Sequence, residues 1–130
     1  MKQIKNGIDL VQISRIDQSI QELGDRFLNR IYTEAEITYC QKKKNAAESF
    51  AARFAAKEAV SKALGTGIGP YGVSFKQIEV QAIQGKAPNI CLYDKTYEYF
   101  KMQGGQSIAI SLSHDGDYAI AFCIIEFEEK

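Results

Sequence analysis

The sequence is poor in the residue types that build zinc sites and disulfide frameworks. It has a single histidine, His114, and three cysteines, Cys40, Cys91 and Cys123, which are far apart and form no CxxC pair. One histidine without paired cysteines excludes the usual zinc-binding patterns. An odd number of dispersed cysteines predicts reduced thiols, which are typical of a cytoplasmic protein.

Long apolar runs and an excess of charge of either sign are also missing. The first residues show no apolar signal-peptide core, and no run approaches the roughly twenty apolar residues of a membrane span. Sixteen basic and sixteen acidic residues give a formal net charge of zero. This balance gives no overall field for nucleic-acid binding, although it allows a local basic patch. We therefore expect a cytoplasmic protein that binds neither membranes nor nucleic acids.

What the sequence does contain is typical of a small globular protein. Hydrophobic residues make up 45% and charged residues 25% of the 130 residues, the balance of a chain that can form a core. The length predicts one domain, residues 1–130. A domain of this size leaves much of its surface in water, so association with copies of itself is compatible with the composition.

Helical periodicity and cap signals predict several short helices and one long one. The expected helical segments are 14–24, 25–32, 33–44, 46–64 and 94–104. The expected N-caps are Ser14, Thr33, Asn45 and Asp94, and Gly65 is expected to end the longest helix. Thr33 is followed by Glu36 in the spacing of a capping box.

Apolar alternation predicts the strands. The expected segments are 4–13, 73–82, 89–92, 107–113 and 118–127. The last two are joined by residues 114–117, which contain an Asp-Gly pair and favour a hairpin. The expected strands and helices do not alternate regularly, so the sequence does not indicate a parallel nucleotide-binding sheet. The sequence thus predicts an α+β fold, with a small antiparallel sheet packed with one long and several short helices.

The long helix has two chemically different sides. At about 100° per residue, one side carries small residues, namely Ala52, Ala55, Ala56, Ala59, Val60 and Ala63. The other side carries charged rows, in which Arg53 and Lys57 repel one another unless an anion lies between them, whereas Glu58 and Lys62 attract. This pattern fits either a solvated helix face or a polyphosphate site with a carboxylate-bound metal.

Asp9 lies on the same face of the expected first strand as Val11 and Ile13. Aspartate is a poor strand residue, and burying its carboxylate is costly unless it is paired or binds a metal. One explanation is a structural ion pair. The other is a hard-cation site shared with Glu58, because Mg²⁺ commonly takes one or two carboxylates together with substrate phosphates. The residues alone leave both open.

Three segments resemble the signatures of holo-[acyl-carrier-protein] synthases, a family of 4′-phosphopantetheinyl transferases. Residues 7–16 read G-I-D followed by R-I, and residues 54–63 read F-x-x-K-E-A-x-x-K. Residues 111–114, Ser-Leu-Ser-His, resemble the C-terminal element of the family. The order, the separation and the total length also agree, so the resemblance covers essentially the whole chain and implies the fold of that family.

The resemblance implies an enzyme that transfers 4′-phosphopantetheine from coenzyme A to a serine of apo acyl carrier protein, as in fatty acid biosynthesis. It implies that Asp9 and Glu58 bind Mg²⁺ together with the coenzyme A pyrophosphate, and that Lys62 is a third catalytic residue that contacts the phosphates. The group that accepts the serine proton is left open among Glu58, Asp9 through a water, and a hydroxide on the metal. A homotrimer with active sites at subunit interfaces is also implied.

The resemblance assigns two further sets of residues. The coenzyme A contacts are Arg53, Lys57, Ser61, Lys62, Gly65 and His114. The acyl-carrier-protein contacts are Arg15, Arg26, Phe27, Arg30 and Phe54. Cationic side chains with apolar neighbours suit an acidic partner, although a solvated arginine face is the alternative for Arg26 and Arg30.

Two other classes of protein compete with the enzyme. A non-catalytic coenzyme A or nucleotide-binding module needs no paired carboxylates. A structural protein–protein adaptor accounts for the arginines but gives no reason for an acid on an apolar strand face. The pair Asp9 and Glu58 therefore favours the enzyme.

Overall fold

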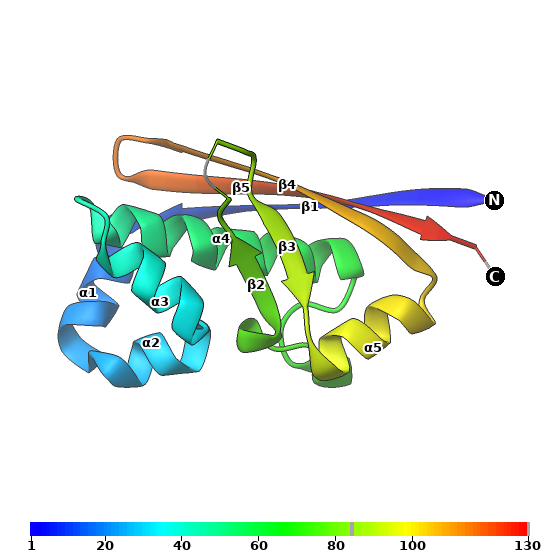
Figure 1. The fold of residues 1–130 in the computed structure, drawn as a ribbon, viewed down its shortest axis with the longest axis horizontal. Helices are drawn as coiled ribbons and strands as arrows, with labels where there is room; N and C mark the ends of the chain where they lie inside the picture. The colour runs from blue at the N-terminus through cyan, green and yellow to red at the C-terminus, as the bar shows by residue number, and fades with distance from the viewer. Residues whose placement is uncertain (84, 130) are drawn as a thin grey trace.

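The computed structural model describes residues 1–83 and 85–129 (Figure 1). The elements follow in the order β1 (Lys2–Gln12), α1 (Ile13–Leu23), α2 (Asp25–Ile31), α3 (Glu34–Gln41), α4 (Ala46–Leu64), two 3₁₀ turns (Pro70–Gly72 and Phe75–Gln77), β2 (Ile78–Gln81), β3 (Asn89–Leu92), α5 (Asp94–Met102), β4 (Gly105–Asp115) and β5 (Tyr118–Glu128). The structure confirms the α+β class with antiparallel sheets, one long helix and several short ones.

The strands form two antiparallel sheets on different sides of α4. The larger sheet has the order β1-β5-β4, and the smaller one pairs β2 with β3. Figure 1 shows α4 running along the larger sheet, with α1, α2 and α3 at one end and α5 at the other. The long helix packs mainly against β1 and β5, so the middle strand and its neighbour form one wall of the core.

The small side of α4 allows the larger sheet to approach closely. Ala55, Ala59 and Ala63 are essentially inaccessible to solvent. Gly7 of β1 lies against them, and a Cβ added at Gly7 would overlap the carbonyl oxygen of Ala59 and lie 2.7 Å from the backbone nitrogen of Ala63. The backbones of β1 and α4 are therefore in contact, which leaves no room for any side chain at residue 7.

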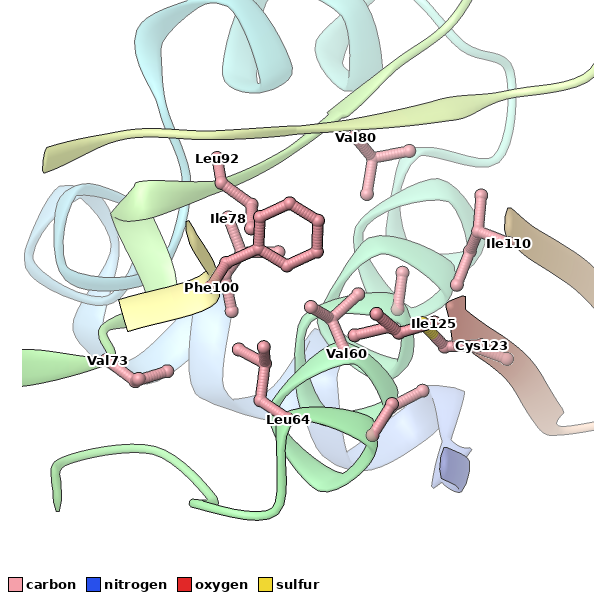
Figure 2. Packing of buried hydrophobic residues seen from close by; sticks show 14 of the residues in the cluster. Val60, Leu64, Val73, Ile78, Val80, Leu92, Phe100, Ile110, Cys123 and Ile125 are labelled. Atoms are coloured by element: carbon pink, nitrogen blue, oxygen red, sulfur yellow. The ribbon is translucent and has the colours of Figure 1, made fainter. Parts of the chain in front are cut away.

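The other side of α4 packs on the smaller sheet and α5. Figure 2 shows Val60 and Leu64 of α4 pointing toward Phe100 of α5, with Ile78 and Leu92 from the β2–β3 pair beside them. These residues belong to one buried cluster that also includes Cys123 and Ile125 of β5. The long helix is thus the centre of the fold, enclosed by both sheets.

Several expected caps are present. The Thr33 side chain accepts a hydrogen bond from the Glu36 backbone N–H, and the Glu36 carboxylate accepts one from the Thr33 N–H at 2.9 Å, which completes a capping box. Asn45 caps α4 through the Glu48 N–H, and Gly65 ends the helix with φ of 86°. These predictions are confirmed.

Two expected caps are wrong. β1 runs into α1 without a loop, so that Gln12 takes the N-cap position and Ser14 lies inside the first turn. At α5 the N-cap position is Tyr93, and Asp94 is the first helical residue, with an unusual φ of 49°. In both cases the N-cap lies one or two residues earlier than predicted, because extended backbone continues up to the start of the helix.

The strand expected at 73–82 is shorter than predicted. Only Ile78–Gln81 forms a strand, and Phe75–Gln77 is a 3₁₀ turn. Side chains take the backbone groups that a ladder would use, because Lys57 Nζ binds the Phe75 carbonyl at 2.9 Å and Thr96 Oγ1 accepts from the Ser74 N–H at 3.2 Å.

Among the helices in residues 1–83 and 85–129, none combines the length and the apolar character that a membrane crossing requires.

Candidate functional site

Asp9 reaches from β1 to the C-terminal half of α4. Its Oδ1 lies 3.0 Å from Lys62 Nζ, and the same nitrogen donates to the Ile8 carbonyl at 2.9 Å. The side chain of Asp9 is 15% exposed, whereas that of Lys62 is 50% exposed. The partner of Lys62 is thus Asp9, while the sequence predicts Glu58. The close contact of Gly7 with α4 brings Asp9 within reach.

Glu58 is the second carboxylate of this site. It is half-buried on α4, one turn before Lys62. Burial raises the pKa of Glu58 and the negative charge of Asp9 raises it further, while Lys62 lowers it. The two carboxylates therefore repel one another. A cation between them would remove this repulsion.

Asp9 and Glu58 line one cavity of about 350 Å³. Its walls also include Arg15 from the first turn of α1, Phe27 from α2 and Phe54 from α4. One cavity thus contains the acidic pair expected to hold a metal and three of the residues expected to meet a protein partner.

The two carboxylates fit a magnesium ion whose remaining ligands come from a substrate and from water. Within the part of the chain that the structure describes, no group of three or more histidine, cysteine or acidic side chains converges. Two carboxylates leave most positions of an octahedral cation open for water and phosphate oxygens, which is how Mg²⁺ is commonly bound beside phosphates. Asp9 and Glu58 are the residues that would hold it.

Two of the expected coenzyme A contacts are committed to the protein interior. Lys57 is fully buried, and its Nζ lies 2.7 Å from Glu36 Oε1 and donates to the carbonyls of Phe75 and Ile78. Ser61 is also buried and donates to the Glu58 carbonyl at 2.7 Å. The structure does not bring either side chain to a surface where a ligand would bind.

The buried pair of Lys57 and Glu36 has a structural role. Burial lowers the pKa of Lys57, and the adjacent Glu36 carboxylate partly offsets this effect. Glu36 also accepts from the Val80 N–H at 2.8 Å, so that the pair joins α3 and α4 to β2. The helical pattern predicts a surface row for Lys57. It gives no sign of the pair with Glu36, which is distant in the sequence and also fits the capping box.

Arg53 lies at a second, larger cavity of about 670 Å³. Its side chain packs on the Tyr39 ring at 4.4 Å and donates to Ser49 Oγ at 3.2 Å, yet its buried Nε has no hydrogen-bond partner among the described residues. Lys43 and Lys86 line the same cavity, and its lining contains no carboxylate among the residues that the structure describes. Three cations and one unsatisfied buried donor favour binding of an anion.

The remaining expected contacts lie on the surface. His114 is in β4, not in the turn, with Nε2 3.4 Å from Glu48 Oε1, and Gly65 is exposed at the end of α4. Arg15 is exposed on α1, and Arg26 and Arg30 are exposed on α2. Phe54 is half-buried and stacks on Phe75 at 5.3 Å.

Comparisons with known proteins agree with the sequence motifs. The family model of the 4′-phosphopantetheinyl transferase superfamily matches residues 6–123. The chain is 51% identical to a holo-[acyl-carrier-protein] synthase of Koribacter versatilis over 120 residues, 92% of this chain and 95% of the relative. It is 42% identical to the synthase of Geobacter sp., with the same coverage of both chains.

Solved structures give the same result. The Helicobacter pylori synthase in complex with coenzyme A superposes with a TM-score of 0.81 at 38% identity, covering 92% of this chain and 98% of that one. The Neisseria meningitidis synthase superposes with a TM-score of 0.85 at 30% identity, covering 93% and 96%.

Proposed function

The chain belongs to the 4′-phosphopantetheinyl transferase superfamily and transfers 4′-phosphopantetheine from coenzyme A to acyl carrier protein, and we propose that Asp9, Glu58 and Lys62 form its reaction centre. The observation that supports this centre is the convergence of two carboxylates from different elements on one cavity, with Lys62 bound to one of them.

In the reaction the hydroxyl oxygen of a carrier-protein serine bonds to the β-phosphorus of coenzyme A. The bond from that phosphorus to the bridging oxygen breaks, and adenosine 3′,5′-bisphosphate leaves. The serine proton passes to a carboxylate of the Asp9–Glu58 pair, directly or through a water. Catalysis of such a transfer depends mainly on positioning and on neutralising charge on the phosphate oxygens.

Asp9 and Glu58 would hold Mg²⁺, which would supply part of this neutralisation as a Lewis acid. Lys62 supplies the rest. Its ammonium group is half-exposed and pairs with Asp9 in this structure. The flexible lysine is proposed to turn from Asp9 toward the bridging oxygen of the departing nucleotide.

The nucleotide end of coenzyme A fits the cationic cavity at Arg53. The unsatisfied Nε of Arg53 and the ammonium groups of Lys43 and Lys86 suit phosphate oxygens, and the Tyr39 ring gives an apolar surface for a base. His114 and Gly65 are proposed to contact the cofactor at the edges of its path. Lys57 and Ser61 support α4 from inside.

Arg53 and Glu58 point in different directions from α4. Five residues of helix turn them about 140° apart, and they line different cavities. One coenzyme A molecule that uses both an Arg53 cavity and an Asp9–Glu58 pair is therefore best accommodated between two subunits, each of which supplies one of them.

The outer face of the larger sheet supports such an assembly, which we propose to be a homotrimer. It exposes five large apolar side chains: Ile4, Ile8, Leu10, Phe122 and Ile124. The β1–β5 register pairs Ile8 with Phe122, so these side chains form one continuous patch. Exposed patches of this kind are typical of protein interfaces. The Asp9 side chain points to the opposite face of β1, toward α4. Because β1 is an edge strand of the larger sheet, a copy that covers the patch and extends past β1 would border the reaction centre.

The carrier protein is proposed to dock on α1 and α2. Arg15, Phe27 and Phe54 line the Asp9–Glu58 cavity, and Arg26 and Arg30 extend the cationic surface along α2. Cationic side chains around apolar ones suit an acidic helical partner and bring its serine to the carboxylates.

The three free cysteines fit the reducing cytoplasm, where fatty acid biosynthesis would use the enzyme.

One assay tests the proposal against both competing classes. The purified chain is mixed with coenzyme A, Mg²⁺ and an apo acyl carrier protein, and the carrier is weighed by mass spectrometry. We expect one phosphopantetheine group to be added, and Asp9→Asn to prevent the addition. A binding module would retain coenzyme A without modifying the carrier. An adaptor would bind the carrier and leave coenzyme A unbound.

A further inference from the structure

The first turn of α1 has no cap from its own sequence. β1 ends at Gln12 and α1 begins at Ile13, and the Gln12 side chain forms no capping hydrogen bond. The first backbone N–H groups of a helix need acceptors from elsewhere.

Asp117, from the turn between β4 and β5, supplies these acceptors. Its carbonyl accepts from the Ile13 N–H at 2.7 Å, and its Oδ1 accepts from the Ser14 N–H at 3.0 Å. Its Oδ2 accepts from the Ser14 hydroxyl at 2.6 Å. One residue thus makes three hydrogen bonds to the start of α1, across more than a hundred residues of sequence.

The charge of Asp117 suits this place. The hydrogen bonds from the Ser14 hydroxyl and backbone lower the pKa of Asp117 below its usual value of 3.8, so the carboxylate is ionised at neutral pH. A negative charge at the N-terminus of a helix is favourable because the helix dipole is positive there.

The register of the larger sheet fixes the position of Asp117. The β1–β5 ladder ends with Gln12 opposite Tyr118, so the next pair along the two chains is Ile13 and Asp117. The hairpin tip therefore extends the pairing of β1 into the helix. Gly116, with φ of 57°, lets the chain turn immediately before Asp117.

Arg15 lies one residue beyond this anchored point. It is exposed on the first turn of α1 and lines the cavity that contains Asp9 and Glu58. We propose that Asp117 is a positioning residue for the carrier protein: it fixes the start of α1 and thereby directs Arg15 toward the docking partner. This inference rests on the proposed docking role of Arg15.

Steady-state kinetics with the carrier protein and coenzyme A varied separately test this inference. For Asp117→Ala we expect the KM for the carrier protein to rise roughly fivefold, an effect of the size of a lost N-cap, with the KM for coenzyme A and kcat nearly unchanged. Asp117→Asn keeps an acceptor for the Ser14 N–H and should recover part of the loss. Asp115→Ala removes the same charge from the same hairpin and should leave the KM for the carrier protein unchanged.

A double-mutant cycle separates positioning from a merely structural role. If Asp117 acts through Arg15, Asp117→Ala in an Arg15→Ala background should raise the KM for the carrier protein less than twofold further. Additive effects, or a lower melting temperature with an unchanged KM for the carrier protein, would overturn the inference. Should Asp117→Ala fail to fold, Ser14→Ala, which removes one of the three hydrogen bonds, gives the same comparison with a smaller effect. If Arg15→Ala itself leaves the KM for the carrier protein unchanged, the proposed docking surface is wrong. The positioning role of Asp117 is then rejected as well, because it acts through Arg15.

Discussion

Gly7 of β1 lies in direct backbone contact with Ala59 of α4, and this contact sets the distance between Asp9 and the charged residues of the helix. A Cβ at residue 7 would overlap the Ala59 carbonyl oxygen and lie 2.9 Å from Lys62 Cβ. Two residues further along β1, Asp9 forms its ion pair with Lys62. The glycine of the G-I-D motif is therefore needed for the geometry of the site as well as for packing.

Gly7→Ala should weaken both the fold and the site. The methyl group has to push β1 away from α4, which overpacks the core and destabilises the protein by about 1–3 kcal/mol or more. Transfer activity should fall in the surviving folded fraction because Asp9 moves with the strand. Chemical denaturation and the transfer assay measure the two effects. Asn6→Ala, at the exposed neighbouring position, is the control, and a Gly7→Ala protein as stable as wild type would contradict the close contact.

The buried pair of Lys57 and Glu36 should behave as a unit. Glu36→Gln leaves the buried ammonium without its counter-charge and should lower the free energy of unfolding by about 3–5 kcal/mol. Adding Lys57→Met should restore much of this loss, because the double variant buries no charge. Urea denaturation of the single and double variants measures the coupling. Losses that simply add in the double variant would show that Lys57 and Glu36 are not energetically coupled.

Arg15→Glu should raise the KM for the carrier protein while the coenzyme A Kd changes little. The difference from wild type should shrink as salt rises, since screening weakens the attraction of the wild-type surface. Gln21→Glu, at an exposed position of the same helix, controls for a general change of surface charge. A variant that loses coenzyme A affinity and keeps carrier affinity would move the docking surface elsewhere.

Lys62→Ala should lower kcat by roughly 10²-fold, as the removal of a group that stabilises developing negative charge commonly does. Coenzyme A affinity should fall less than kcat, because the interaction is strongest when the bond to the leaving nucleotide breaks. The exposed Lys76→Ala serves as the matched control. If Lys62→Ala keeps the wild-type kcat, Lys62 has no catalytic role and serves only as the ion-pair partner of Asp9.

Local signals in the sequence predicted the helices well. The capping box at Thr33, the cap at Asn45 and the αL glycine at Gly65 each involve residues within a few positions of one another, and the structure confirms them. The cap at Ser14 failed because its competitor, Asp117, comes from the far end of the chain. Cap patterns therefore predict well only where no distant segment offers better acceptors.

The site was only partly readable from the residues. Spacing alone left Asp9 and Glu58 open to two explanations, and the family motifs brought them together. Lys57 looked like a surface cation because its helical row also holds Arg53, and nothing near it in sequence indicated Glu36 as its partner. Burial of a charged pair is a property of tertiary packing, which a helical period cannot show.

The initial rate of phosphopantetheine transfer, measured against Mg²⁺ concentration, tests the central claim most directly. Wild type and the control Asp17→Asn should saturate at similar rates, because Asp17 is an exposed acid on α1 away from the cavity lining. Asp9→Asn and Glu58→Gln should keep a folded circular-dichroism spectrum, lose nearly all activity and recover part of it only at much higher Mg²⁺. Near-normal rates and an unchanged Mg²⁺ dependence in both variants would contradict the two-carboxylate reaction centre.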